Sequence, residues 1–244
     1  MIETHQRFAA AALEKITVII PTLNEAAHIP AALDLFFRGP DVPEVIVVDG
    51  GSTDQTVDKA RACGAQVLMA SGGRAEQMNA GARVATGSLF LFLHADTLLP
   101  AGFQCAVRET LWLAGVAGGA FQFRLDRSTA GLRLVEKMTN WRARRLQLPY
   151  GDQALFMRAA MFREIGGFPA MPIMEDFEFV RRLRRRGRIC IVPEPAITSA
   201  RRWQMRGVFK TALLNQIIIA AYYLGIPPSL LARWYRGRQV AAGR

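Results

Sequence analysis

Three clusters of acidic and polar residues could together hold an anionic ligand through a divalent metal ion. They are Pro21-Thr22-Leu23-Asn24-Glu25, Asp49-Gly50-Gly51-Ser52-Thr53-Asp54 and His94-Ala95-Asp96. Each cluster follows a short apolar run, at 16–20, 45–48 and 89–93. If these runs are strands of an open parallel sheet, the clusters converge on the crevice at the carboxyl ends of the strands, where such sheets bind ligands. The chemistry of these residues suits a sugar nucleotide held through the metal.

Asp96 is the candidate metal ligand, because carboxylate oxygens suit hard cations such as Mg²⁺ or Mn²⁺. A metal at this position would neutralise a departing diphosphate. His94 could ligate Mn²⁺, contact a ribose or only fill space. Asp96 could instead cap a helix that begins near Leu98.

The first two clusters could hold a nucleoside. The carboxylate of Asp49 can accept from a base N–H or a ribose hydroxyl, and the glycines after it let the backbone approach a ligand. Asp49 could instead only stabilise the turn. Pro21, Thr22 and Glu25 lie beside it, although Glu25 would also suit the first turn of a helix. Arg74 could hold a base or phosphate, or be an ordinary exposed arginine.

A second acidic pair, Glu175 and Asp176, begins an amphipathic stretch. A helix N-terminus keeps a carboxylate ionised and therefore ready to accept a proton from an attacking hydroxyl. The two residues could instead only cap the helix. Residues that could shape an acceptor pocket nearby are Gly151, Asp152, Gln153, Arg202 and Trp203.

The pattern of apolar residues predicts an α/β fold. Strands at 16–20, 43–48, 65–70 and 88–93 alternate with helices at 26–38, 53–63 and 75–85, which gives a Rossmann-like, mostly parallel sheet with helices on both faces. The alternation weakens after Asp96, where we expect an antiparallel extension. Its predicted helices lie at 101–113, 129–147, 159–165 and 175–187, and its predicted strands at 118–124, 154–157 and 189–192. We expect a single domain over 1–244, with a nucleotide-binding half at 16–96, an acceptor and catalytic half at 97–203 and a helical tail at 204–244.

Composition narrows the class of function. The net charge of +11 indicates an anionic partner: nucleotide phosphates, an acidic membrane surface or nucleic acid. No nucleic-acid-binding module is recognisable, so we expect no nucleic acid partner. The sequence lacks Gly-x-Gly-x-x-Gly after the first strand and lacks a P-loop, which disfavours dinucleotide dehydrogenases and P-loop NTPases. Three scattered cysteines and the absence of a secretory signal in the short apolar stretch at 8–13 favour the cytoplasm.

The tail contains an uncharged stretch, Thr211 to Ala232, interrupted by Asn215, Gln216 and Pro227-Pro228. Its helical portion of about 16 residues would extend only ~24 Å, short of the ~30 Å hydrocarbon thickness of a bilayer. We expect the 208–232 segment to pack on the body or to form a homo-oligomer. The alternative is peripheral contact with the inner face of the membrane, favoured by flanking cations: Arg201, Arg202, Arg206, Lys210, Arg233, Arg236 and Arg238.

In this order, Pro-Thr-Leu-Asn-Glu, Asp-Gly-Gly-Ser-Thr-Asp, His-Ala-Asp and Glu-Asp resemble the motifs of family 2 glycosyltransferases with the GT-A fold, from Ile16 to Trp203. Leu-His-Ala-Asp-Thr, Tyr-Gly-Asp-Gln-Ala and Ile-Met-Glu-Asp are similar to the bacterial branch associated with radical-SAM and selenium-domain proteins and with arsenosugar biosynthesis. The family resemblance implies inverting transfer by a single displacement. It implies roles for Pro21, Thr22, Glu25 and Asp49 around the nucleoside, Arg74 near the base, Asp96 on the metal and Asp176 as general base. His94 stands where many members have aspartate, which leaves the ribose contact and the preferred metal open.

We therefore expect a cytoplasmic, Mn²⁺- or Mg²⁺-dependent inverting glycosyltransferase. Its donor would be a nucleoside-diphosphate sugar, and its acceptor a small-molecule hydroxyl that receives a hexosyl or pentosyl group. Two alternatives stay open: glycosyl transfer to a polyprenyl phosphate at the membrane surface, and a catalytically silent module that binds nucleotide-sugars.

Overall fold

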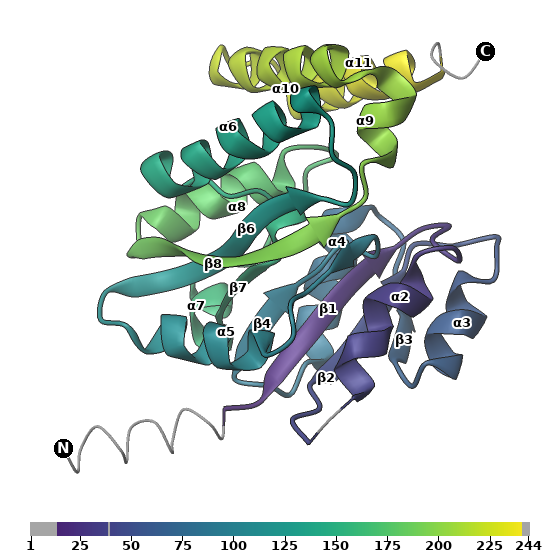
Figure 1. Cartoon of the computed structure of the whole chain (residues 1–244), viewed down its shortest axis with the longest axis vertical. Coiled ribbons are helices and arrows are strands. Elements are labelled where there is room, and N and C mark those ends of the chain that lie inside the picture. Colours follow the sequence, from purple (N-terminus) through teal and green to yellow (C-terminus); the bar gives the residue numbers. More distant parts are fainter. Residues whose placement is uncertain (1–13, 39, 241–244) are drawn as a thin grey trace.

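A mixed eight-stranded sheet forms the centre of the computed structural model, which describes residues 14–38 and 40–240 (Figure 1). The strand order is β3-β2-β1-β4-β7-β6-β8-β5. The strands are β1 (Ile16–Thr22), β2 (Glu44–Asp49), β3 (Gln66–Met69), β4 (Leu89–Phe92), β5 (Thr97–Leu98), β6 (Val116–Leu125), β7 (Leu155–Arg158) and β8 (Arg188–Thr198). The first four strands in the chain pair in parallel, as predicted.

Helices cover both faces of this sheet. They are α2 (Ile29–Asp34), α3 (Thr56–Ala62), α4 (Arg74–Val84), α5 (Phe103–Trp112), α6 (Ala130–Leu146), α7 (Ala159–Glu164), α8 (Glu175–Arg184), α9 (Arg201–Arg206), α10 (Val208–Tyr223) and α11 (Pro228–Val240). Two 3₁₀ turns, η1 (Leu35–Phe37) and η2 (Gly151–Gln153), complete the elements.

Alternate side chains of the β-branched strands enter two separate cores, because successive residues of a strand point to opposite faces. Ile19 of β1 packs in the same core as Met78 of α4. Its neighbour Val18 packs in the other core with Leu33 of α2 and Phe103 of α5. The prediction of an α/β sheet covered on both faces is therefore confirmed.

Helix α4 approaches β1 closely because Gly81 has no side chain. A Cβ at this position would lie 2.6 Å from Cγ2 of Ile19 and 3.1 Å from Cγ2 of Val48. The close packing fixes α4 across the first two strands. It also places the N-terminal end of α4, where Arg74 begins the helix, beside the carboxyl end of β1.

The second half joins the sheet through antiparallel pairing. Strand β7 is antiparallel to both β4 and β6, and β5 is antiparallel to β8, while β6 and β8 are parallel. Strand β8 runs well beyond the 189–192 segment predicted from the sequence. The prediction stopped short because Pro193 and Pro195 lack the N–H that a sheet ladder needs. The strand continues through a register shift, where Phe121 pairs with Val192 and the next residue, Gln122, pairs with Pro195.

The tail folds back onto the body of the protein. Leu214, Ile218 and Ala221 of α10 are buried in the same core as α4 and α8, which confirms that the tail packs on the body. Gly225, with a φ of +81°, and Pro227 separate α10 from α11. Within 14–38 and 40–240, none of the helices combines the length and the apolar character that a membrane crossing would need. The stretch at 8–13 and the side chains of Arg206, Arg236 and Arg238 lie outside the described residues.

Candidate functional site

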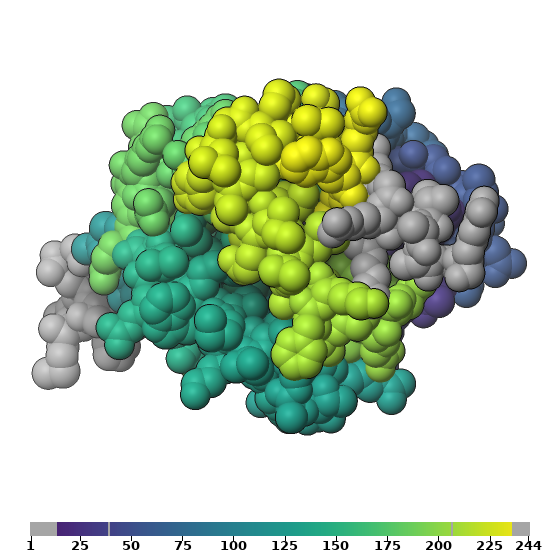
Figure 2. Space-filling view, turned by 90° about the horizontal axis from the view of Figure 1, so that it is seen from above, coloured from purple at the N-terminus to yellow at the C-terminus, as the bar shows by residue number. Residues whose placement is uncertain are grey.

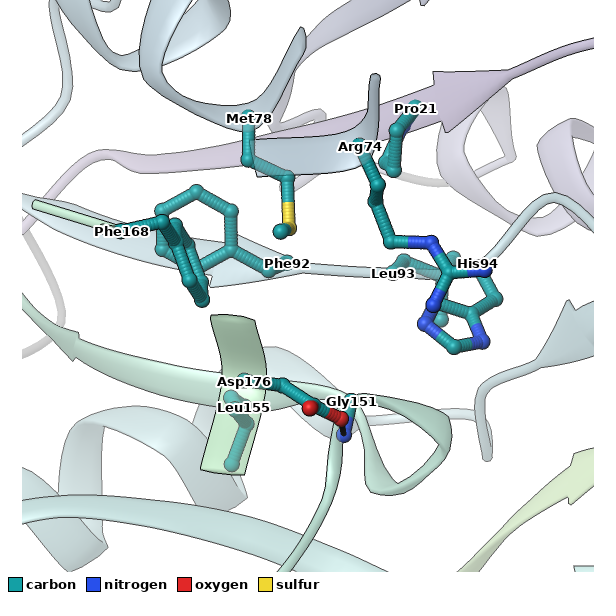
Figure 3. Close-up of a pocket in the computed structure, with 10 residues that line it drawn as sticks. All are labelled: Pro21, Arg74, Met78, Phe92, Leu93, His94, Gly151, Leu155, Phe168 and Asp176. Atoms are coloured by element: carbon teal, nitrogen blue, oxygen red, sulfur yellow. Dashed lines mark hydrogen bonds between the residues drawn. The ribbon is translucent and has the colours of Figure 1, made fainter. Parts of the chain in front are cut away.

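A small pocket lies at the carboxyl ends of β1 and β4, with about 260 Å³ of atom-free space that includes its opening to solvent (Figure 3). Its walls come from both halves of the chain. Five of its lining residues belong to the predicted site: Pro21, Arg74, His94, Gly151 and Asp176. The others are Met78, Phe92, Leu93, Leu155 and Phe168.

Asp176 is held toward the pocket at the start of α8. Its Oδ2 accepts a 2.9 Å hydrogen bond from the N–H of Gly151, and its Oδ1 accepts one of 2.7 Å from the N–H of Phe177. The second bond is local to the helix start, as the capping alternative predicts. The first joins residues 25 positions apart and ties the start of α8 to the η2 turn.

Gly151 lets His94 and Asp176 come close together. A Cβ on Gly151 would lie 2.9 Å from Nε2 of His94 and 3.3 Å from Oδ2 of Asp176. Burial holds the pKa of His94 well below its ordinary value, and the nearby guanidinium groups of Arg74 and Arg202 lower that pKa further. His94 is therefore a neutral imidazole that presents a lone pair at neutral pH.

Glu175 is buried next to Asp176 and is not one of the residues that line the pocket. It is 6% exposed, and its Oε1 is 3.7 Å from Nη1 of Arg74. Burial raises the pKa of Glu175, and the adjacent carboxylate of Asp176 raises it further, while Arg74 opposes the shift. Arg74 itself lines the pocket and keeps a side-chain exposure of 43%, so it can reach a bound anion.

Asp49 is fully buried at the end of β2, and the carboxylate is used by its own turn. Oδ1 accepts from the N–H groups of Gly51 at 2.9 Å and Ser52 at 2.7 Å, and Oδ2 accepts from the hydroxyls of Ser52 and Thr22. The turn-stabilising alternative therefore describes this structure. Thr22 and Asp49 tie β1 to the turn after β2, and neither lines the pocket.

Arg201 links Asp96 to the first cluster. Its Nη2 lies 3.3 Å from Oδ2 of Asp96 and also contacts Oε1 of Glu25, while its Nη1 lies 3.3 Å from Nδ1 of His28. Oε2 of Glu25 is 3.0 Å from the same histidine nitrogen. The alternative that Asp96 caps a helix is wrong, because β5 follows it and α5 begins only at Phe103.

The donor set at Asp96 fits Mg²⁺ or Mn²⁺ only if the ligand supplies oxygens. Among the described residues, no group of three or more His, Cys, Asp or Glu side chains could hold a metal ion. One carboxylate together with substrate phosphates is nevertheless a common way to bind Mg²⁺. The side chain of Asp96 is 18% exposed, so its oxygens can be reached from solvent.

The predicted acceptor-pocket residues divide between the site and its scaffold. Gln153 is fully buried and donates to the carbonyl of Phe121, so it supports the backbone instead of lining the pocket. Trp203 packs in a small separate cluster with Leu132. Arg202 lies close enough to His94 to lower its pKa, and it contacts the hydroxyl of Tyr235 at 3.4 Å.

Asp152 lies beside the pocket with an unusual environment. Burial raises its pKa to about 6, although Arg142 opposes the shift. Oδ1 of Asp152 and Nη2 of Arg142 are both closed to solvent without a hydrogen-bond partner. Arg142 lies 3.4 Å above the ring of Tyr150. Arg142 lies within the helix predicted at 129–147, and the sequence carries no signal of its closeness to Asp152, because that closeness depends on tertiary packing.

Comparison with known proteins finds similarity in both sequence and fold. The family described as Glycosyl transferase family 2 matches residues 17–161. A PGL/p-HBAD biosynthesis glycosyltransferase of Mycobacterium bovis (strain BCG / Pasteur 1173P2) is 42% identical over 91 residues, which cover 34% of this chain and 36% of that protein. Glucosyl-3-phosphoglycerate synthase of Mycobacterium tuberculosis is 33% identical over 103 residues, covering 38% of this chain and 32% of that protein. The matched segments thus span about a third of these curated relatives.

Two solved structures share the fold. The mannosyltransferase PcManGT from Pyrobaculum calidifontis, in complex with GDP-Man and Mn²⁺, has a TM-score of 0.61 at 21% identity and covers 80% of this chain and 66% of that one. Glucosyl-3-phosphoglycerate synthase from M. tuberculosis, in complex with phosphoglyceric acid, has a TM-score of 0.60 at 23% identity, with 78% and 74% covered. These similarities confirm the predicted GT-A architecture.

Proposed function

Because the chain belongs to glycosyl transferase family 2, we propose that it moves a hexosyl or pentosyl group from a nucleoside-diphosphate sugar to a small-molecule hydroxyl, with inversion. The observation that carries this proposal is the meeting of Arg74, His94 and Asp176 in one pocket at the strand ends. These residues offer a cation for phosphate, a neutral imidazole and a base. They come from three separate segments of the sequence, so their meeting follows from the fold alone.

The donor would occupy the side of the pocket made by the first half. Pro21 lines the pocket, and Glu25 keeps 17% side-chain exposure, so both can contact the nucleoside. Thr22 and Asp49 hold the turn that supports this wall. Arg74 is a partly exposed cation in the pocket lining, so it can contact the phosphates. Related structures support this donor class, since they contain GDP-Man with Mn²⁺ and UDP-Glc with Mn²⁺.

Asp96 would hold the divalent cation together with phosphate oxygens. When bound, Mn²⁺ or Mg²⁺ would neutralise negative charge on the leaving diphosphate. Arg201 already lies against Asp96 and Glu25, so its guanidinium is placed to orient both carboxylates.

Asp176 would act as the general base. Each oxygen of its carboxylate accepts one backbone hydrogen bond and keeps further capacity to accept an acceptor hydroxyl. As the acceptor oxygen attacks the anomeric carbon, Asp176 takes the hydroxyl proton and the nucleoside diphosphate leaves from the opposite face. Glu175 would position this end of α8 through its contact with Arg74. Asp152 is the second candidate base, because it follows Gly151 at the pocket and burial raises its pKa to about 6, near the pH at which a general base works.

The test is donor turnover by the purified chain with UDP- and GDP-sugars, with Mn²⁺ or with a chelator. We expect metal-dependent release of nucleoside diphosphate that is lost in Asp96→Ala. Asp176→Asn should retain donor binding, measured by thermal shift, while turnover falls about 10²-fold or more, as for loss of a general base. Asp58→Asn, an exposed carboxylate on α3, is the matched control.

Three outcomes would count against parts of this assignment. Wild-type turnover in Asp176→Asn together with loss in Asp152→Asn would move the base to Asp152. Retained metal dependence in Asp96→Ala would remove Asp96 as the metal ligand. Donor binding without any turnover would favour a catalytically silent nucleotide-sugar-binding module.

We keep the assignment to the branch associated with radical-SAM and selenium-domain proteins, because the stretches that carry the likeness supply His94, Asp152 and Asp176. Transfer to a polyprenyl phosphate is the second candidate reaction, favoured by the cationic residues of the tail beside Arg202. An acceptor panel with short polyprenyl phosphates and small polyols separates the two, since only one class should accelerate donor turnover.

A further inference from the structure

Helix α10 is apolar on the side that faces solvent as well as on the side that faces the core. Leu214 and Ile218 are buried, at 8% and 3% exposure. On the outward side, Phe209 is 75% exposed, Leu213 62% and Ile217 42%. A helix that is apolar all round is normally covered all round. Among residues 14–38 and 40–240, no segment covers the outward side of α10, although such an apolar composition normally requires a cover.

Helix α6, on which α10 packs, presents a similar outward side. Leu134, Met138 and Trp141 are each more than half exposed, and their spacing puts them on one side of the helix. We define the tail face as the exposed side chains of Leu134, Met138, Trp141, Phe209, Leu213 and Ile217. Seen from above, the tail helices and segments from the middle of the chain share one face of the molecule (Figure 2).

The surroundings of the tail face are strongly cationic. Residues 195–244 contain no Asp or Glu, and among the side chains that the structure describes there, Arg202, Lys210 and Arg233 are exposed. Helix α6 adds the exposed Lys137, Arg144 and Arg145, and its one acid, Glu136, is buried against Arg133. Exposed apolar and aromatic side chains among cations are typical of helices that lie in an anionic lipid interface.

We propose that the tail face docks on the surface of an anionic phospholipid bilayer, with α6 and α10 lying along it. A second copy of the chain fits this face less well, because a symmetric contact would bring cations against cations. A bilayer surface supplies both the apolar layer and the negative charge that the face matches.

The tail helices also contact the elements that carry the pocket residues. Phe177, next to Asp176 on α8, packs edge-on against Tyr222 and Tyr223 of α10, with ring centroids 5.7 Å apart in both pairs. Arg201 of α9 extends from the same region to Asp96. The helices that carry the tail face therefore pack directly against elements of the candidate site. The docking itself does not depend on the proposed transfer reaction and is measured without donor.

The test is flotation of the full chain with vesicles of phosphatidylcholine alone or mixed equally with phosphatidylglycerol, at low and high salt. We expect binding to the mixed vesicles at least about tenfold tighter than to neutral ones, with the difference lost at high salt. The double variant Phe209→Asp with Leu213→Asp should bind about 100-fold less, since two apolar side chains no longer enter the interface. The pair Met69→Asp and Leu113→Asp, of similar exposure but outside the tail face, should bind as wild type.

Circular dichroism and thermal unfolding would confirm that the aspartate variants fold. Should Phe209→Asp with Leu213→Asp unfold, Lys210→Glu with Arg233→Glu takes its place, because both cations are exposed and their reversal should weaken only the anionic vesicle binding. Equal binding to both vesicle types, or wild-type binding by these variants, would overturn the proposal. So would a dimer in light scattering that the tail-face variant abolishes, since the cover would then be a second copy.

Discussion

Replacing Gly151 with alanine tests whether His94 and Asp176 act together. The backbone of Gly151 is not left-handed, so alanine adds no φ strain, and the change is confined to one methyl group. That methyl would lie 2.9 Å from Nε2 of His94, where ordinary contact needs about 3.5 Å. The imidazole must therefore retreat by roughly half an ångström. Asp176, at 3.3 Å, must also give slightly.

We expect Gly151→Ala to slow donor turnover by about 10- to 100-fold, because a displacement near 1 Å costs about 10²-fold in a positioned reaction. This corresponds to about 1.4–2.7 kcal/mol of transition-state stabilisation. The free energy of unfolding should change by less than about 1 kcal/mol, since the pocket is open and the histidine can move into it.

The assay is the initial rate of nucleoside-diphosphate release with Mn²⁺, paired with urea unfolding. Gly131→Ala is the control, because the nearest atoms to its added methyl would be those of Val208, at an ordinary 3.4 Å. It should turn over as wild type and be slightly more stable, since alanine favours a helix over glycine. Turnover by Gly151→Ala within twofold of wild type would refute the view that His94 and Asp176 meet at Gly151 during the reaction.

Three further predictions concern stability. Gly81→Ala should lower the free energy of unfolding, measured in urea, by about 1–2 kcal/mol. The new Cβ would lie 2.6 Å from Ile19, a clash that costs about 2–3 kcal/mol, while the higher helix propensity of alanine returns ~1 kcal/mol. An unchanged unfolding midpoint would contradict the close approach of α4 to β1. Since the raised pKa of Asp152 favours its protonated form in the folded state, the unfolding free energy should fall by up to about 3 kcal/mol as pH rises from 4 through about 6. In urea unfolding at several pH values, Asp152→Asn should remove this decrease in the unfolding free energy. If the variant and the wild type show the same pH dependence, Asp152 is not buried as described. Asn79→Ala should lower the free energy of unfolding by about 1–3 kcal/mol, because the Asn79 side-chain amide hydrogen-bonds both the N–H and the carbonyl of Phe168. Thermal unfolding measures this change. An unchanged stability would mean that water replaces both hydrogen bonds.

The first half of the fold could be predicted because its information is local. Runs such as Ile16 to Ile20 are β-branched and short, and each is followed by a turn cluster, so strand, turn and helix follow from neighbouring residues. Strand β8 could not be bounded this way, since Pro193 and Pro195 argue against a strand unless a register shift is known. Helix α9, six residues long, is too short for its periodicity to stand out.

The candidate site could be predicted as a set of residue types but not as a set of contacts. The backbone N–H groups of Gly51 and Ser52 follow Asp49 closely enough in the chain to hydrogen-bond its carboxylate. The sequence alone does not distinguish this local bonding from bonding of the carboxylate to a ligand. The pairing of Arg201 with Asp96 spans 105 positions and depends on β5 meeting β8. The placement of Arg142 beside Asp152 depends likewise on how α6 packs on the sheet.

The antiparallel pairing of β4 with β7 determines when the pocket forms during folding. These strands are the seam between two parts of the chain that are separately continuous in sequence, with Leu89 opposite Arg158 and Phe92 opposite Leu155. Pairings between residues so distant close late in folding, because a long loop must first be ordered. A nascent chain with only its first four strands formed would carry Arg74 and His94 but no counterpart from Gly151 or Asp176. The pocket is therefore expected to form when β4 and β7 pair. The rate at which the amides of β4 and β7 become protected from hydrogen exchange during refolding would measure this step.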